Sequence, residues 1–106
     1  MLLADQGADV VKVEPFGGDI AAAPRVTANS TAMFVPCNRG TRSIALDPQE
    51  PAALEAVRRL IAGADALARN VRPGTMERLG LDEPAMRPLN PGLVHVSISG
   101  VGETGP

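Results

Sequence analysis

Residues 93–99 read Leu93-Val-His-Val-Ser-Ile-Ser99, a run without acidic, lysine or arginine residues in which apolar and β-branched side chains predominate. Such runs are typical of β-strands, and Asn90-Pro-Gly92 directly before this one predicts a turn. Apolar residues on both faces of a strand are typical of parallel sheets, which are covered on both sides. We therefore expect the strongest strand of the chain at Leu93–Ser99, within a parallel sheet.

Short apolar runs alternate with segments of helical spacing on the N-terminal side of this strand. The expected strands are Asp9–Glu14, Ser43–Leu46 and Asp65–Asn70, and the expected helices are Met1–Gln6, Ala52–Ala62 with Pro51 at its first position, Gly74–Leu79 and Glu83–Leu89. We expect a surface loop at Ile20–Ser30 and a short helical turn at Thr31–Val35. Alternating strands and helices predict an α/β fold with a parallel sheet and right-handed crossovers.

The helix expected at Ala52–Ala62 carries one apolar face. Its members recur at helical spacing and are Leu54, Val57, Leu60 and Ile61. Both ends of the sequence differ from those of a complete domain, because a helix is represented by a single turn at the start and no helix follows the strongest strand. We therefore expect at most one domain, incomplete at both ends, from the middle of a larger α/β domain.

Composition excludes several functional classes. The chain has 106 residues, 44% of them hydrophobic, with 10 basic and 12 acidic residues for a net charge of −2. No basic field favours nucleic acid, and two Phe without Trp or Tyr provide no stacking platform. No apolar stretch approaches the roughly 20 residues that span a bilayer, so we expect no membrane segment. One Cys excludes an internal disulfide framework and fits a reducing, cytoplasmic setting.

Three features are consistent with either a functional or a purely structural role. Gly100-Val-Gly-Glu-Thr-Gly105 matches the dinucleotide-binding spacing G-x-G-x-x-G after a strand, but a glycine-rich turn is the favoured interpretation. His95 has no second His, so a sheet-face histidine is favoured over a metal ligand. For Cys37, a buried or inert thiol is favoured over a nucleophile.

Two segments follow expected parallel strands, and ligands of open α/β sheets bind outside the carboxyl ends of the strands. Asn70-Val-Arg-Pro-Gly74 is one, and its Arg72, together with Arg78 beyond it, suits a phosphate. Leu46-Asp-Pro-Gln49 is the other. Either alone is consistent with a turn carrying solvated side chains, whereas both together favour an anionic ligand.

Several segments in order resemble the family III CoA-transferases, which include formyl-CoA transferase, carnitine CoA-transferase and α-methylacyl-CoA racemase. They are Leu3–Pro15, Gly17-Gly-Asp19, Asn38–Asp47, Asn70–Gly74, Glu77–Gly80, Leu89–Pro91, Ser97–Gly100 and Thr104-Gly-Pro106. The resemblance covers nearly the whole chain and is weakest over Ile20–Phe34. It implies a Rossmann-like CoA-binding domain whose parent moves CoA between an acyl-CoA donor and a carboxylic acid acceptor.

The resemblance also implies site residues. The family's CoA-contacting stretches match this sequence at Leu46, Asp47, Pro48 and Gln49 near the adenosine part, at Asn70, Val71 and Arg72, and at Arg78 near the phosphates. The family often has Phe where Val71 stands, so apolar packing against CoA is expected to be weaker here. CoA is a substrate, and neither a cofactor nor a metal is implied.

No aspartate of this sequence matches the family's catalytic aspartate, which the resemblance places shortly beyond Pro106. The first strand and a CoA-contacting loop of the family likewise precede Met1. We therefore expect these residues to supply CoA binding rather than chemistry, within a longer cytoplasmic enzyme that forms homodimers. The alternatives are a non-catalytic nucleotide-binding module and a functionless truncated product. The sequence does not separate transferase from racemase.

Overall fold

The computed structural model describes residues 2–16 and 37–102 of the chain. Its contacts divide the chain into two compact units, Met1–Asp47 and Pro48–Pro106, and each is described by itself. The loop expected at Ile20–Ser30 and the helical turn expected at Thr31–Val35 lie outside the described residues.

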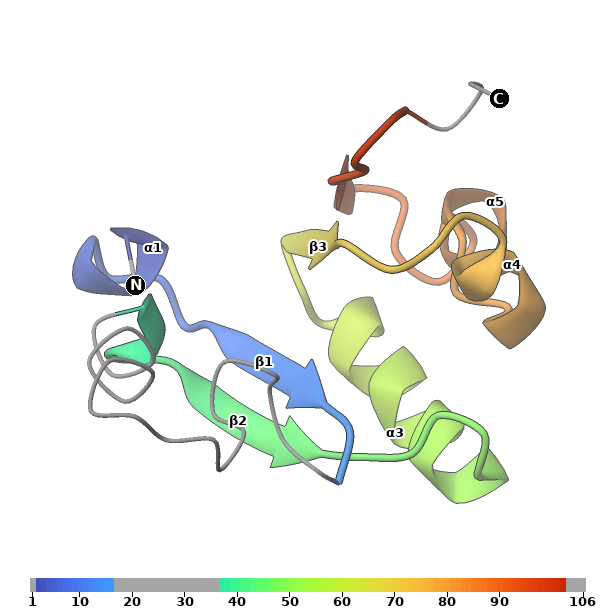
Figure 1. The fold of residues 1–106 in the computed structure, drawn as a ribbon, viewed down its shortest axis with the longest axis horizontal. Coiled ribbons are helices and arrows are strands. Elements are labelled where there is room, and N and C mark those ends of the chain that lie inside the picture. Colours follow the sequence, from blue (N-terminus) through green and yellow to red (C-terminus); the bar gives the residue numbers. More distant parts are fainter. Residues whose placement is uncertain (1, 17–36, 103–106) are drawn as a thin grey trace. The chain divides into compact units, whose positions relative to one another are not determined.

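The first unit contains a pair of parallel strands. A short helix, α1 (Leu2–Asp5), ends before Gly7, whose φ of +96° suits the residue that follows a helix. Strand β1 (Val11–Glu14) then pairs in parallel with β2 (Arg42–Ala45), as Figure 1 shows. The predicted strands are confirmed, with β2 starting one residue before the expected Ser43.

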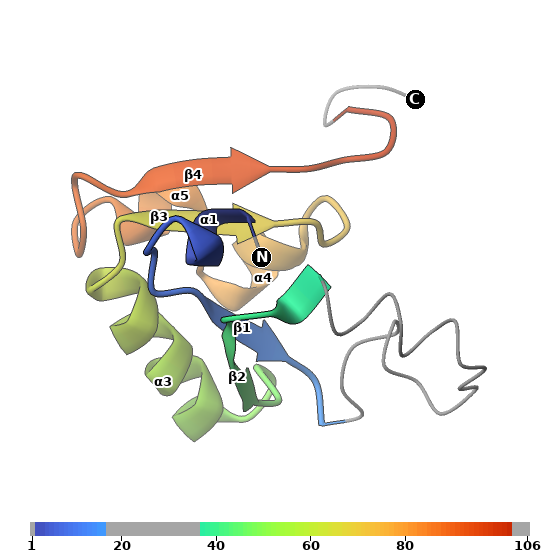
Figure 2. The ribbon, with the colours of Figure 1, turned by 90° about the vertical axis from the view of Figure 1, so that its left-hand side faces the viewer.

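The second unit contains another parallel pair and three helices. Helix α3 (Pro51–Ala62) leads into β3 (Ala66–Arg69), which is followed by α4 (Thr75–Leu79), α5 (Glu83–Met86) and β4 (Val94–Ser97). Strands β3 and β4 run side by side in Figure 2, with Ala66 opposite Val94 and Arg69 opposite Ser97. The predicted α/β class with parallel strands is therefore confirmed for the described residues.

Several predicted elements were too long. Gly74 has a φ of +81° and stands before α4 instead of inside it, because a left-handed residue does not continue an α-helix. Helix α5 stops at Met86, and residues 87–89 form turns instead. The ladder of β4 starts after Leu93 and ends before Ser99 because its partner β3 is itself only four residues long.

The core of the second unit is small and apolar. Its buried members are Val57, Ile61, Met76, Leu81 and Met86. Of the predicted apolar face of α3, Val57 and Ile61 are buried, whereas Leu60 is 38% exposed. The buried stripe of α3 therefore consists of Val57 and Ile61, which are four positions apart, and is narrower than the apolar face of four residues. No helix among the described residues is long and apolar enough to span a membrane.

The free backbone groups at the two ends of α3 have different hydrogen-bond partners. At its start Pro51 occupies the first turn, and the capping residue Glu50 makes no side-chain hydrogen bond to the helix. At its end, the Nδ2 group of Asn90 donates to the carbonyl oxygens of Ile61, at 2.9 Å, and Ala64, at 2.7 Å. The last carbonyls of a helix have no partner within the helix. Asn90 adds a second donor to the carbonyl of Ile61, which also accepts from the backbone N–H of Ala64 at 3.1 Å, and supplies a donor to the carbonyl of Ala64 just beyond α3.

One face of the β3–β4 pair is apolar and exposed. Side chains alternate between the faces of a strand, and the face that carries Val94 and Val96 is 58% and 43% exposed at these residues. Ile98, next on the same side, is 62% exposed. Exposed apolar sheet faces recruit other chains.

We predict that Asn90→Ala destabilises the chain by about 1–3 kcal/mol, because the carbonyl of Ala64 loses its side-chain donor and that of Ile61 keeps only the backbone N–H of Ala64. Asn90→Asp should cost at least as much, since a carboxylate then faces the same two oxygens. Denaturant titration followed by circular dichroism measures both changes. Asn70→Ala, the same substitution at an exposed position, is the matched control, and an equal loss of stability in Asn70→Ala and Asn90→Ala would contradict the prediction.

We also predict that the chain self-associates at high concentration through the face of Val94, Val96 and Ile98. Val96→Lys should weaken this association, because a charge on an exposed sheet face opposes stacking and strand pairing. Light scattering over a concentration series measures the mean mass. Leu89→Lys, which places the same charge at another exposed apolar side chain, should leave the association unchanged. A monomeric wild-type chain throughout the series would show that this face does not drive association.

Candidate functional site

The loop after β3 presents three of the predicted CoA contacts together. Asn70, Val71 and Arg72 are all exposed and directly follow the last residue of β3. The backbone N–H of Ile98 donates to the carbonyl oxygen of Arg69 at 2.9 Å, so the segment after β4 starts beside this loop. These residues thus lie at the carboxyl ends of two neighbouring parallel strands, where sheets of this class bind ligands.

A tight turn connects this loop to Arg78. The backbone N–H of Thr75 donates to the carbonyl of Arg72 at 3.1 Å, and that of Arg78 donates to the carbonyl of Gly74 at 3.1 Å. The guanidinium of Arg78 reaches back along α4, and its Nη2 group donates to Thr75 Oγ1 at 3.3 Å. Arg78 is exposed like Arg72, so both cations are open to an anion from solvent.

The other predicted segment, Leu46–Gln49, follows β2. The backbone N–H of Leu46 donates to the carbonyl of Glu14 at 2.9 Å, which extends the β1–β2 pairing by one bond. Leu46, Asp47 and Pro48 are half-buried, and Gln49 is exposed. The boundary between the two compact units falls after Asp47. The role of all four residues in CoA binding stays a prediction.

The other sequence candidates have these positions. Gly100 and Gly102 are exposed, with a φ of +82° at Gly102, and Gly105 lies outside the described residues. His95 lies half-buried in β4, opposite Leu67. The described part of the chain contains no group of three or more His, Cys, Asp and Glu side chains suited to a metal ion. Cys37 is exposed, so of the two expected states, buried or inert, its thiol is not buried; that it is inert stays a prediction.

Comparison with known proteins identifies relatives over the whole chain. The sequence profile of CoA-transferase family III matches residues 1–106. Succinate–glutarate CoA-transferase of Agrobacterium fabrum is 43% identical over 99% of this chain, and succinyl-CoA–D-citramalate CoA-transferase of Chloroflexus aurantiacus is 41% identical over 99%. A crystal structure of the Rv3272 protein of Mycobacterium tuberculosis superposes on 99% of this chain with a TM-score of 0.89 at 38% identity.

The relatives are much longer than this chain. It spans 28% of the Agrobacterium protein, 27% of the Chloroflexus protein and 29% of the Rv3272 chain. The similarity therefore concerns about a quarter to three tenths of each relative. Because the match runs through every segment on which the resemblance rests, the fold expected from it is confirmed.

Two ion pairs that the sequence analysis did not predict join Arg39 and Arg42, the first residue of β2, to aspartates near the N-terminus. Arg39 donates from Nε and Nη2 to the carboxylate of Asp5 at 3.3 and 2.6 Å, and Arg42 donates from the same atoms to that of Asp9 at 2.9 and 2.6 Å. Hydrogen bonds from Arg39 hold the pKa of Asp5 below its ordinary value and raise the pKa of Arg39. The partners are 33 and 34 residues apart, a separation for which no spacing rule exists.

We predict that Asp5→Asn lowers the stability of the chain at neutral pH and loses this effect in acid. The pKa of Asp5 in the folded chain is lowered from its ordinary value of 3.8. The ion pair therefore stabilises fully above that value, and its contribution disappears as the pH falls through the lowered pKa. Denaturant titrations across this range compare the two proteins.

The free energies of unfolding of the wild-type chain and Asp5→Asn should converge in acid. Glu77→Gln is the control, since Glu77 is another exposed carboxylate. A difference between wild type and Asp5→Asn that stays constant from neutral pH down to about pH 2 would rule out this account, because a protonated Asp5 no longer attracts Arg39.

Proposed function

The chain belongs to CoA-transferase family III, and we propose that its residues bind coenzyme A for transfer between an acyl-CoA donor and a carboxylic acid acceptor. The observation that carries the proposal is the exposed loop Asn70–Arg72 at the carboxyl ends of β3 and β4, with Arg78 one turn further on. This is where the fold class binds its ligands.

The chemistry of these side chains suits coenzyme A, which carries a pyrophosphate and a ribose phosphate. Guanidinium groups form charge-assisted, often bidentate hydrogen bonds to phosphate oxygens. Arg72 and Arg78 are both exposed, and the hydrogen bond to Thr75 restrains the guanidinium of Arg78. Val71 is 40% exposed beside them and offers an apolar contact. We assign Leu46, Asp47, Pro48 and Gln49 to the adenosine part.

The proposed share of this chain in the reaction is binding and orientation. In the family a catalytic aspartate attacks the acyl-CoA and forms acyl-anhydride and thioester intermediates, which is covalent catalysis by a carboxylate. No aspartate in residues 1–106 matches it in the resemblance. The relatives described above are named as CoA-transferases of succinate, glutarate and citramalate, which favours transferase over racemase chemistry.

Two further expectations rest on the resemblance: the longer enzyme forms homodimers, and it acts in the cytoplasm. The alternative function is a nucleotide-binding module without a role in transfer, which the glycine-rich segment after β4 would suit. Coenzyme A and NAD both contain an adenosine and a pyrophosphate. A module of that kind would therefore bind both, whereas a CoA-binding chain should prefer coenzyme A.

We predict that the 106-residue chain binds coenzyme A and that Arg72→Gln or Arg78→Gln weakens this binding about three- to tenfold. Charge-assisted hydrogen bonds contribute about 1.5–3 kcal/mol when well formed, and exposure reduces that range. Isothermal titration with coenzyme A, and with NAD in parallel, measures the effect. Arg87→Gln is the matched control, because Arg87 is exposed, follows α5 in the sequence and pairs with Glu83.

Equal affinities for coenzyme A and NAD would favour the nucleotide-binding module. Unchanged affinity for coenzyme A in both Arg72→Gln and Arg78→Gln would remove these two residues from the proposed site.

A further inference from the structure

A groove of about 460 Å³ lies in the second unit between α3 and the segment that contains α5. Its lining residues are Glu55, Arg58, Arg59, Ala62, Gly80, Ala85, Met86 and Leu89. None of them is among the eight predicted contacts to coenzyme A. The groove is therefore a second candidate site, with a chemistry of its own.

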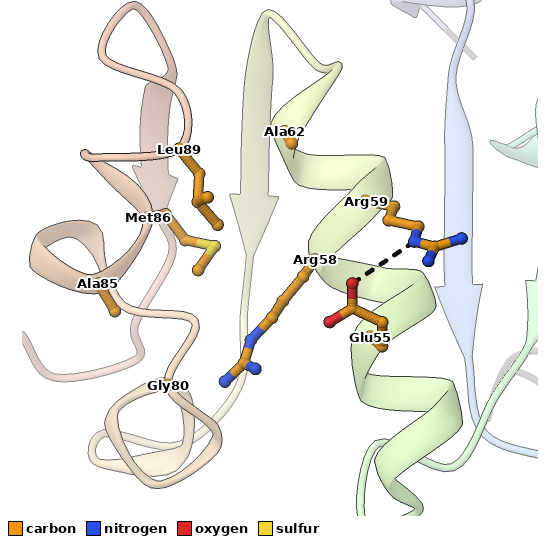
Figure 3. A pocket seen from close by; sticks show the side chains of 8 residues that line it. All are labelled: Glu55, Arg58, Arg59, Ala62, Gly80, Ala85, Met86 and Leu89. Carbon is orange, nitrogen blue, oxygen red and sulfur yellow. Dashed lines mark hydrogen bonds and ion pairs between the residues drawn. The ribbon is translucent and has the colours of Figure 1, made fainter.

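The walls of the groove are apolar except for its charged residues on α3. Met86 is buried at its base, and Leu89 is 54% exposed along its side. Glu55 and Arg59, which also line the groove, form an ion pair with each other at 3.4 Å, drawn as a dashed line in Figure 3. The charges of these two residues thus offset one another.

Arg58 is different. It leaves α3 toward Gly80, on the side of Met86 and Leu89, as Figure 3 shows, and it is half-buried. Among the described residues it has neither an ion-pair partner nor a side-chain hydrogen bond. The groove consequently holds one positive charge that the residues around it do not neutralise.

Gly80 keeps the space that this guanidinium occupies. Its φ is +68°, a conformation that side-chain-bearing residues rarely adopt, and a Cβ placed there would lie 3.0 Å from Arg58 Nη2. The backbone N–H of Leu81 donates to the carbonyl of Met76 at 2.9 Å, which fixes this turn at the end of α4. The guanidinium of Arg58 therefore has room at this position because residue 80 is a glycine.

We propose that this groove binds a small amphipathic carboxylate, with the carboxylate on Arg58 and the apolar chain along Met86 and Leu89. A guanidinium next to apolar walls favours a planar anion that accepts two parallel hydrogen bonds. Small-molecule sites are concave, largely apolar and about 300–1,000 Å³ in volume, with a few polar groups that fix the ligand's orientation. The groove meets each of these conditions.

The test is nuclear magnetic resonance of the 106-residue chain, isotopically labelled, with octanoate as the probe. We expect saturable shifts at the backbone amides of Ala62, Gly80 and Leu89 and at the methyl group of Met86. Acetate, which has the charge without the chain, and 1-octanol, which has the chain without the charge, should each bind at least fivefold more weakly. Equal shifts with 1-octanol and octanoate would overturn the proposal, because they would show a purely apolar contact.

Two variants assign the charge. Arg58→Gln should weaken octanoate binding at least fivefold, whereas Arg87→Gln, the same change in an exposed arginine that pairs with Glu83 outside the groove, should leave it within twofold of wild type. The dispersion of the amide spectrum shows directly whether each variant is folded. If Arg58→Gln unfolds, Arg58→Lys is used instead and should weaken octanoate binding, because a lysine ammonium lacks the planar fork. Unchanged octanoate affinity in a folded Arg58 variant would overturn the proposal.

Discussion

The second unit depends on the side-chain amide of Asn90. Its two hydrogen bonds reach Ile61 and Ala64 at the end of α3, while the backbone carbonyl of Asn90 accepts from Leu93 at 3.2 Å on the way into β4. One residue thus connects the end of the helix before β3 with the entry to β4. Because the backbone N–H of Val94 also donates to Asp65, at 3.0 Å, the two strands start level with each other.

Local sequence signals were sufficient to predict the helices and strands, but not the hydrogen bonds that connect them. Pro51 and the apolar spacing of α3 predicted that helix correctly. Short apolar runs, β-branched at Asp9–Glu14 and Leu93–Ser99, predicted the four strands. The turn at Asn90-Pro91-Gly92 was predicted from its residue types, but the bonds of Asn90 to residues 26 and 29 positions away carry no periodic signal. Spacing placed Leu60 on the apolar face of α3 without showing how much of that face is covered.

The candidate sites divide in the same way. Asn70, Val71, Arg72 and Arg78 follow a strand that composition reveals, so topology alone predicted a ligand-binding edge there, while the identity of the ligand came from resemblance. The groove around Arg58 had no counterpart in the sequence analysis. Arg58 and Arg59 are adjacent and chemically identical, and the structure separates one that pairs with Glu55 from one that faces Gly80.

The methionines in the core link oxidation of the second unit to its unfolding. Two of the five buried residues of the second unit are methionines, and Met86 is only 2% exposed. Peroxide converts an accessible thioether into a polar sulfoxide, which a packed apolar core does not accommodate. Oxidation of Met76, which is buried and does not line the groove, therefore requires the unit to open first, and once it has occurred it opposes reclosure. If the unit opens briefly under oxidative stress and a methionine is oxidised, the unit stays open until a reductase restores the thioether.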